Sequence, residues 1–161
     1  MTMKKIILTV IAAFLFTMCG TTNTTKGTTV KKNRPEVQYK DDFRAASSKE
    51  KSELLKQLNA TGSNYSVIIF TKNYKGEKVT ATNSKKSLYS AYPISDLRTG
   101  IADKTRIDNT LDTKVYDNRS KQEAIIPAAE AKKYKFIYIM KNLEANNPFV
   151  ITYSNTLRPL E

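Results

Sequence analysis

The sequence YKFIYIMK at residues 134–141 predicts a β-strand, because its side chains alternate between two faces with the period of a strand. One face would carry Tyr134, Phe136, Tyr138 and Met140, and the other would carry Lys135, Ile137, Ile139 and Lys141. The residues NNP at 146–148 then predict a turn into FVITY at 149–153. These two stretches are therefore expected to pair as neighbouring strands.

Strand patterns also precede this hairpin. Residues 65–71 contain the run VIIF, which is typical of a strand buried on both faces. A turn at 73–76 predicts that 78–82 returns as the antiparallel partner of that strand. Further strands are expected at 88–94 and 111–116, an apolar stretch at 124–126 stops at Pro127, and the polar stretch 95–109 receives no assignment. Successive hairpins indicate an antiparallel sheet or a small β-sandwich rather than alternating βα units.

One helix is predicted between residues 47 and 60. Ser47 followed by Glu50 has the form of a capping box, in which each side chain accepts a hydrogen bond from the other residue's backbone amide. The apolar stripe of this helix would consist of Leu54, Leu55 and Leu58, and Gly62 would end it. The sequence thus predicts one domain over 36–161 that is mainly β, with one flanking α-helix.

The N-terminus has the layout of an export signal. Lys4 and Lys5 precede an apolar run at 6–16, and the single cysteine of the chain, Cys19, follows closely. Eleven residues of helix rise roughly 17 Å, whereas a bilayer core is about 30 Å thick, so the run is too short to span a membrane. A cleaved signal is therefore expected.

These twenty residues resemble the signal of bacterial lipoproteins, through the paired lysines, the short apolar run, Cys19 at its end and the small Gly20 behind it. The resemblance implies that residues 1–18 are removed and that Cys19 is acylated, which would attach the protein to a membrane facing the periplasm, expected to be the outer membrane. Residues 19–35 would be the lipidated cysteine and a flexible tether, because they contain six threonines and few apolar residues.

Removing the signal lowers the net charge from +12 to +10, which favours anionic partners such as lipid phosphates, cell-wall polymers or an acidic protein surface. The lysines that could form a basic contact surface are Lys72, Lys75, Lys78, Lys132, Lys133 and Lys135. Aromatic residues and lysines alternate over 135–139 as they do on RNA-binding sheets, but the glycines of that motif are missing and an exported protein is not expected to meet nucleic acid.

No catalytic signature follows the signal. The chain lacks histidine, the usual general base near neutral pH, and its one thiol is the expected acylation site. Asp103, Asp108, Asp112 and Asp117 lack the spacing of a calcium loop. No enzyme activity, metal or cofactor is therefore expected, and the chain is interpreted as a structural or binding lipoprotein of the cell envelope. Two alternatives stay open: an accessory lipoprotein of an envelope-spanning secretion system such as type VI, and a basic polyanion-binding or cell-wall-binding module.

Overall fold

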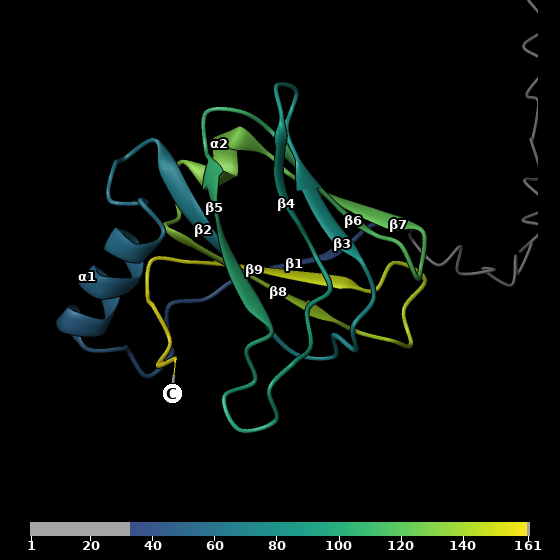
Figure 1. Ribbon diagram of the computed structural model, residues 1–161, viewed down its shortest axis with the longest axis horizontal. Helices are drawn as coiled ribbons and strands as arrows, with labels where there is room; N and C mark the ends of the chain where they lie inside the picture. Colours follow the sequence, from purple (N-terminus) through teal and green to yellow (C-terminus); the bar gives the residue numbers. More distant parts are fainter. Residues whose placement is uncertain (1–32, 161) are drawn as a thin grey trace, which may run out of the picture. The chain divides into compact units, whose positions relative to one another are not determined.

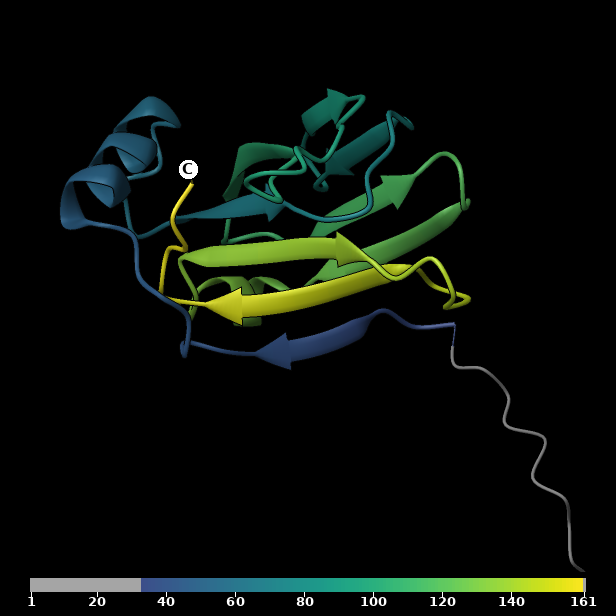
Figure 2. The ribbon, with the colours of Figure 1, turned by 90° about the horizontal axis from the view of Figure 1, so that it is seen from below.

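Two β-sheets packed face to face form the body of the protein in a computed structural model, which describes residues 33–160 (Figure 1). This part of the chain contains nine strands and two helices, so the prediction of a mainly β fold is confirmed. The two layers of strands are seen edge-on in Figure 2, with helix α1 at one side. The predicted signal, Cys19 and most of the predicted tether lie outside the described residues.

The first sheet has the strand order β1-β9-β8-β2-β5. These strands are β1 (Glu36–Tyr39), β9 (Phe149–Ser154), β8 (Phe136–Lys141), β2 (Tyr65–Phe70) and β5 (Asp103–Asp108). The predicted antiparallel pairing of β8 with β9 is confirmed. However, β1 runs parallel to β9 and β2 runs parallel to β8, so this sheet is mixed rather than antiparallel.

The second sheet has the order β4-β3-β6-β7 and is antiparallel throughout. Its strands are β4 (Ser87–Ala91), β3 (Val79–Thr82), β6 (Thr113–Asp117) and β7 (Gln122–Ile126). The predicted pairing of 78–82 with 65–71 is therefore wrong, because β3 crosses to this sheet while β2 pairs with β5 and β8. Strand β5 was not predicted because its sequence, DKTRID, contains a single apolar residue, Ile107.

Apolar side chains are buried on both faces of the first sheet. Ile68, Ile137 and Ile139 lie between the two sheets, in a cluster with residues of the second sheet such as Val79 and Val115. The opposite faces of the same strands carry a second cluster, which helix α1 and the C-terminal segment cover. Each fully buried side chain of this size contributes about 1.5–3 kcal/mol. The continuous apolar runs of β2 and β8 reflect this burial on both sides.

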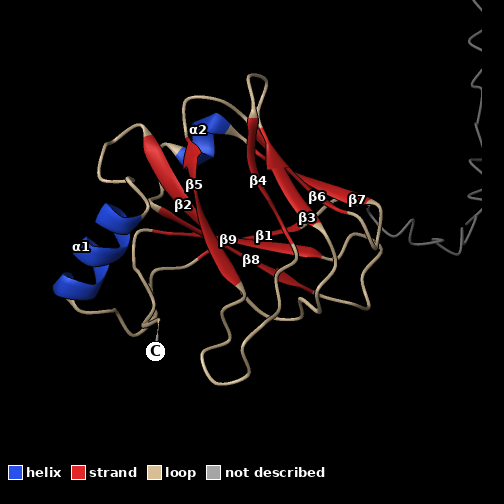
Figure 3. Ribbon diagram, viewed as in Figure 1, coloured by secondary structure: helices blue, strands red, loops and turns tan. Residues whose placement is uncertain are grey.

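Helix α1 (Ser48–Gln57) is drawn in blue in Figure 3. It begins as predicted but ends differently. The Ser47 hydroxyl accepts a hydrogen bond from the Glu50 amide at 3.1 Å. The Glu50 carboxylate, however, accepts from the Leu160 amide at 2.6 Å, so it ties the C-terminal segment to the helix. The chain leaves the helix at Asn59, which has φ 50°, and not at Gly62. A second, short helix, α2 (Ala128–Ala131), connects β7 to β8.

Candidate binding site

A lysine is buried between the two sheets. Lys141, the last residue of β8, lies on the same face of the strand as Ile137 and Ile139, and it is only 2% exposed. Its ammonium lies 2.6 Å from the Asp117 carboxylate at the end of β6, and it also pairs with Glu77 from the loop between β2 and β3. All three side chains are at most 6% exposed. This ion triad therefore links β8 to the second sheet and to the loop.

The surroundings of the ion triad keep both carboxylates charged. Burial by itself would raise the pKa of Glu77, but hydrogen bonds from Lys141 and from the Lys75 amide outweigh it and hold that pKa below its usual value. Burial likewise opposes the charge of Asp117, whereas Lys141, the Arg119 amide at 2.8 Å and the Ser120 hydroxyl at 2.9 Å lower its pKa. The ion triad thus has a net charge of −1 at neutral pH, and its ammonium is already paired with both carboxylates.

A pocket of about 330 Å³ opens directly over the ion triad. Its floor includes Lys141, Glu77 and Asp117, and its walls include Lys75, Arg119 and Ser120, with Leu143, Asn146 and Pro148 from the loop between β8 and β9. The volume lies at the lower end of the range for small-molecule sites, which suits one small polar group of a larger partner. Lys75 and Arg119 are exposed, and neither forms an ion pair with any residue in 33–160.

The six lysines of the predicted basic surface lie at two ends of the first sheet. Lys72, Lys75 and Lys78 follow β2 at its C-terminal end, whereas Lys132, Lys133 and Lys135 precede β8. Because β2 and β8 are parallel and in register, the second group lies where both strands begin. Backbone hydrogen bonds join Val67 to Lys135 at one end of these strands and Lys141 to Lys72 at the other. The two groups of lysines are therefore separated by the length of the strands, about 20 Å. The six side chains do not form one continuous surface.

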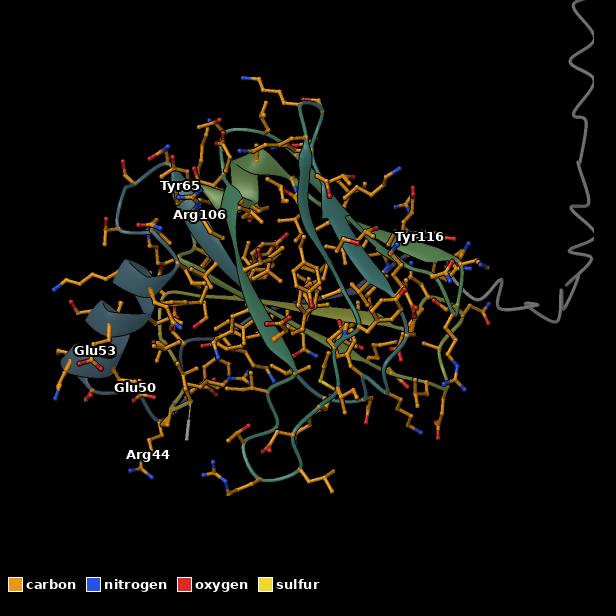
Figure 4. The ribbon with its side chains drawn as sticks, in the orientation of Figure 1. Arg44, Glu50, Glu53, Tyr65, Arg106 and Tyr116 are labelled. Carbon is orange, nitrogen blue, oxygen red and sulfur yellow. The ribbon has the colours of Figure 1, made fainter. Side chains whose placement is uncertain are left out.

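The second group of lysines is largely engaged within the protein. Lys133 pairs with Glu130 at 2.8 Å, and Lys135 donates to the carbonyls of Gly62 and Tyr65, both at 2.9 Å. Burial, and after it the charge of Lys51, lowers the pKa of Lys135. At the same end, the labelled side chains of Arg106 and Tyr65 lie together in Figure 4. The Arg106 guanidinium is 4.5 Å from the centre of the Tyr65 ring, within the range of a cation–π contact. Among the six predicted lysines, those that are exposed and form no ion pair within residues 33–160 therefore lie mainly at the other end. We call that end the basic end, and it comprises Lys72, Lys75, Lys78 and Arg119.

The ion triad, the pocket and Arg119 were not predicted from the sequence. One signal was present, because Lys141 alternates with two isoleucines on a face that packs into the core, and a charge there requires partners. The partners could not be named from the sequence, since Glu77 and Asp117 are 64 and 24 residues away from Lys141. Their meeting depends on the packing of the two sheets.

The other three aspartates weighed for calcium have separate local partners. Asp103 accepts from the Tyr89 hydroxyl, Asp108 from Thr110, and Asp112 from the Ala128 amide at the start of α2. In residues 33–160, no three acidic, histidine or cysteine side chains gather in a way that could hold a metal ion.

That same part of the chain contains no helix with the length and apolar character needed to cross a membrane. The chain matches no known protein family and no curated protein.

Proposed function

We propose that this chain is a non-enzymatic, lipid-anchored protein of the cell envelope that binds an anionic partner through its basic end. The observation that carries this proposal is the pair of exposed cations, Lys75 and Arg119, at the mouth of a pocket whose buried charges are already paired. An anionic group entering the pocket would find free donors at the rim. It would not need to displace the Lys141 ammonium from its carboxylates.

The anchor is proposed from the N-terminal sequence. The apolar run that ends near Cys19 resembles a lipoprotein signal, and the first strand of the body begins at Glu36. Residues 20–35 would give a root-mean-square reach of about 20–25 Å if they behave as a soft linker. The body would then lie close to the membrane surface. Several acyl chains on one cysteine would make the attachment stable, whereas a single chain would give only marginal binding.

The absence of catalysis is proposed from the chemistry of the pocket. An amine acts as a base or nucleophile when it is free and neutral, but Lys141 is charged and enclosed by two carboxylates. Glu77 and Asp117 have lowered pKa values, so they are poor proton acceptors at neutral pH. These groups stabilise the fold, and binding is left to the rim.

The anchor is tested by expressing the full chain and a Cys19→Ser variant in a bacterial host and separating membranes from soluble material. We expect the parent protein in the membrane fraction, with an intact mass that lacks residues 1–18 and includes added acyl chains. The variant should be released by a salt wash. A parent protein that retains Met1 and carries no lipid would contradict the anchor.

The basic end is tested by retention of the Cys19→Ser protein on phosphocellulose. Reversing Lys72, Lys75 and Arg119 to glutamate should lower the salt concentration needed for elution. The matched control reverses Lys85, Lys86 and Lys132, which changes the net charge equally at the other end, where Lys86 shares a cavity with Tyr65. Equal loss of retention in both triple variants would mean that general charge, and not this site, binds the polymer.

A further inference from the structure

Three large apolar side chains are exposed on one loop at the basic end. The loop joins β4 to β5, and it carries Tyr92, Ile94 and Leu97, which are 66%, 67% and 101% exposed. It projects beyond the strands at the lower centre of Figure 1. Single exposed apolar residues are ordinary on protein surfaces. Three within six residues on a projecting loop, however, expose a cluster of apolar area whose contact with water is unfavourable.

Hydrogen bonds join this loop to the loop between β2 and β3, which carries Lys72, Lys75 and Lys78. The Gly76 amide donates to the Pro93 carbonyl at 2.9 Å, and Ser95 exchanges two hydrogen bonds with Tyr74, at 2.9 and 3.0 Å. We call the two joined loops, residues 71–78 and 92–102, the tip. The Lys72 side chain lies beside Gly100, so basic and apolar groups meet within the tip.

The exposed segment of the tip has a defined conformation. The Asp96 carboxylate accepts from the amides of Arg98 and Thr99, at 2.9 and 2.7 Å, and the Asp96 amide donates to the Ile101 carbonyl at 3.0 Å. Gly100 closes this turn with φ 69°, a conformation that favours glycine. The turn engages its only acidic group and leaves Leu97 and Arg98 pointing away from the core. An ordered loop presents its apolar side chains with little further loss of conformational entropy.

The chain enters the body at the same end of the first sheet as the tip. Glu36 at the start of β1 pairs with Val150 of β9, and Val150 pairs with Met140 of β8. The next residue of β8, Lys141, donates its amide to the Lys72 carbonyl. Glu36 and Asn73 also line one surface cavity together. A tether that leads from Cys19 to Glu36 would therefore hold this end of the body toward the membrane.

We propose that the tip docks onto the anionic surface of the membrane that anchors the protein. Tyr92, Ile94 and Leu97 enter the headgroup region, and Lys72, Lys75 and Arg98 contact the lipid phosphates. This inference rests on the proposed lipid anchor, which supplies the local concentration that makes a small contact effective. It also names the anionic partner of the basic end as lipid headgroups.

The chemistry of the tip favours a lipid surface over a protein partner. Tyrosine is enriched at membrane interfaces, where its ring is apolar and its hydroxyl is solvated. Lysine and arginine beside inserted apolar side chains are typical of interfacial anchors, which combine buried apolar area with attraction to anionic lipids. The tip also projects, whereas the anchoring side chains of protein interfaces are enclosed by a well-packed ring of neighbouring contacts.

The test uses the full acylated protein in vesicles of phosphatidylethanolamine and phosphatidylglycerol. Because Cys19 is acylated, a Leu97→Cys variant has one free thiol, which is labelled with an environment-sensitive fluorophore. Spin-labelled lipids should quench this label strongly. The control label, on Ser84→Cys in the turn between β3 and β4, lies at the other end of the sandwich and should not be quenched.

The charge contribution is measured in the same assay. Replacing Lys72 and Lys75 by glutamine should lower the ratio of docked to undocked tip by about fivefold for each lysine removed. Replacing Lys85 and Lys86 by glutamine should leave that ratio unchanged. Vesicles of phosphatidylcholine alone should also reduce quenching at position 97.

Two results would overturn the docking proposal while the anchor stands. One is acylated protein on vesicles with no quenching at position 97. The other is a label that is shielded in native membranes but exposed on pure lipid vesicles, which would identify a protein as the partner. A native protein whose mass shows no acyl chains would overturn the anchor itself, and with it the orientation inferred here.

Discussion

Replacing Lys141 by methionine would leave two buried carboxylates without their counter-ion. The methionine side chain has similar length, so the core between the sheets stays filled and the main change is loss of the ammonium. Glu77 and Asp117 would keep their hydrogen bonds to Lys75, Arg119 and Ser120. They would lose the one positive charge that both contact.

The expected loss in the free energy of unfolding is about 3–5 kcal/mol at pH 7, the usual effect of removing one partner from a buried ion pair. Domains of this size have a total stability of about 5–15 kcal/mol, so the variant should remain folded but clearly weakened. Adding Glu77→Gln and Asp117→Asn to Lys141→Met should recover much of that loss, because the triple variant buries no charge.

The loss should depend on pH in a defined direction. In the parent protein the folded-state pKa values of Glu77 and Asp117 are lowered, so their stabilising contribution is complete above the unfolded values of about 3.9–4.3 and is lost as the pH falls through the lower folded values. Without Lys141, burial and mutual repulsion raise both values, and the penalty grows as the pH rises above about 4. The difference between variant and parent should thus be smallest below the lowered folded-state values, where the parent carboxylates are protonated as well, intermediate near pH 4 and largest near pH 7.

Urea unfolding followed by circular dichroism, at several pH values between these limits, measures the difference directly. The matched control is Lys133→Met, which breaks the exposed ion pair with Glu130 and should cause no measurable change. If Lys141→Met were as stable as the parent at pH 7, with no dependence on pH, the ion triad would not be a buried, charged cross-link.

Two further predictions concern polar groups that join distant segments. Ser66→Ala should lower the free energy of unfolding by about 1–3 kcal/mol, because the buried Ser66 hydroxyl donates to the Ala131 carbonyl at 2.7 Å and accepts from the Asn109 side-chain amide at 3.1 Å. Val67→Ala is the packing control. A Ser66→Ala variant as stable as the parent would contradict this prediction. Asp41→Ala should lower the melting temperature at pH 7, since hydrogen bonds from the Ser154 hydroxyl and from the amide that follows it hold the pKa of Asp41 below its usual value. Its stabilising effect is present above pH 4 and disappears as the pH falls through the folded-state value, so a difference that persists at pH 2 would count against this assignment.

Local patterns predicted the elements of the fold better than their partners. The start of α1 at Ser47 and the β8–β9 pair were predictable because each depends on residues close in sequence. The assignment of β3 to the wrong neighbour shows the limit, since a turn between two strand patterns does not show whether the second strand stays in the same sheet. Strand β5 has little apolar pattern in its sequence. Its position at the edge of the sheet depends on its pairing with β2 and not on its own side chains.

The candidate site was less predictable than the fold. Lys72, Lys75 and Lys78 were among the basic residues selected from the sequence, and the structure leaves them exposed at one end. Lys133 and Lys135 were selected on the same grounds but have partners within the protein. Arg119 was not selected, because nothing in its own stretch of sequence indicates that it stands at the rim of a pocket.

By itself, the amino-acid sequence determined that the body is mainly β, where its central hairpin and long helix begin, and that its charge is strongly positive. These properties follow from side-chain periodicity, capping and composition, which act over a few residues. Which strands share a sheet, how Lys141 meets two carboxylates, and which lysines are exposed at the tip depend on the tertiary structure. Those outcomes depend on contacts between residues tens of positions apart, and they form when the two sheets pack together to bury their apolar faces.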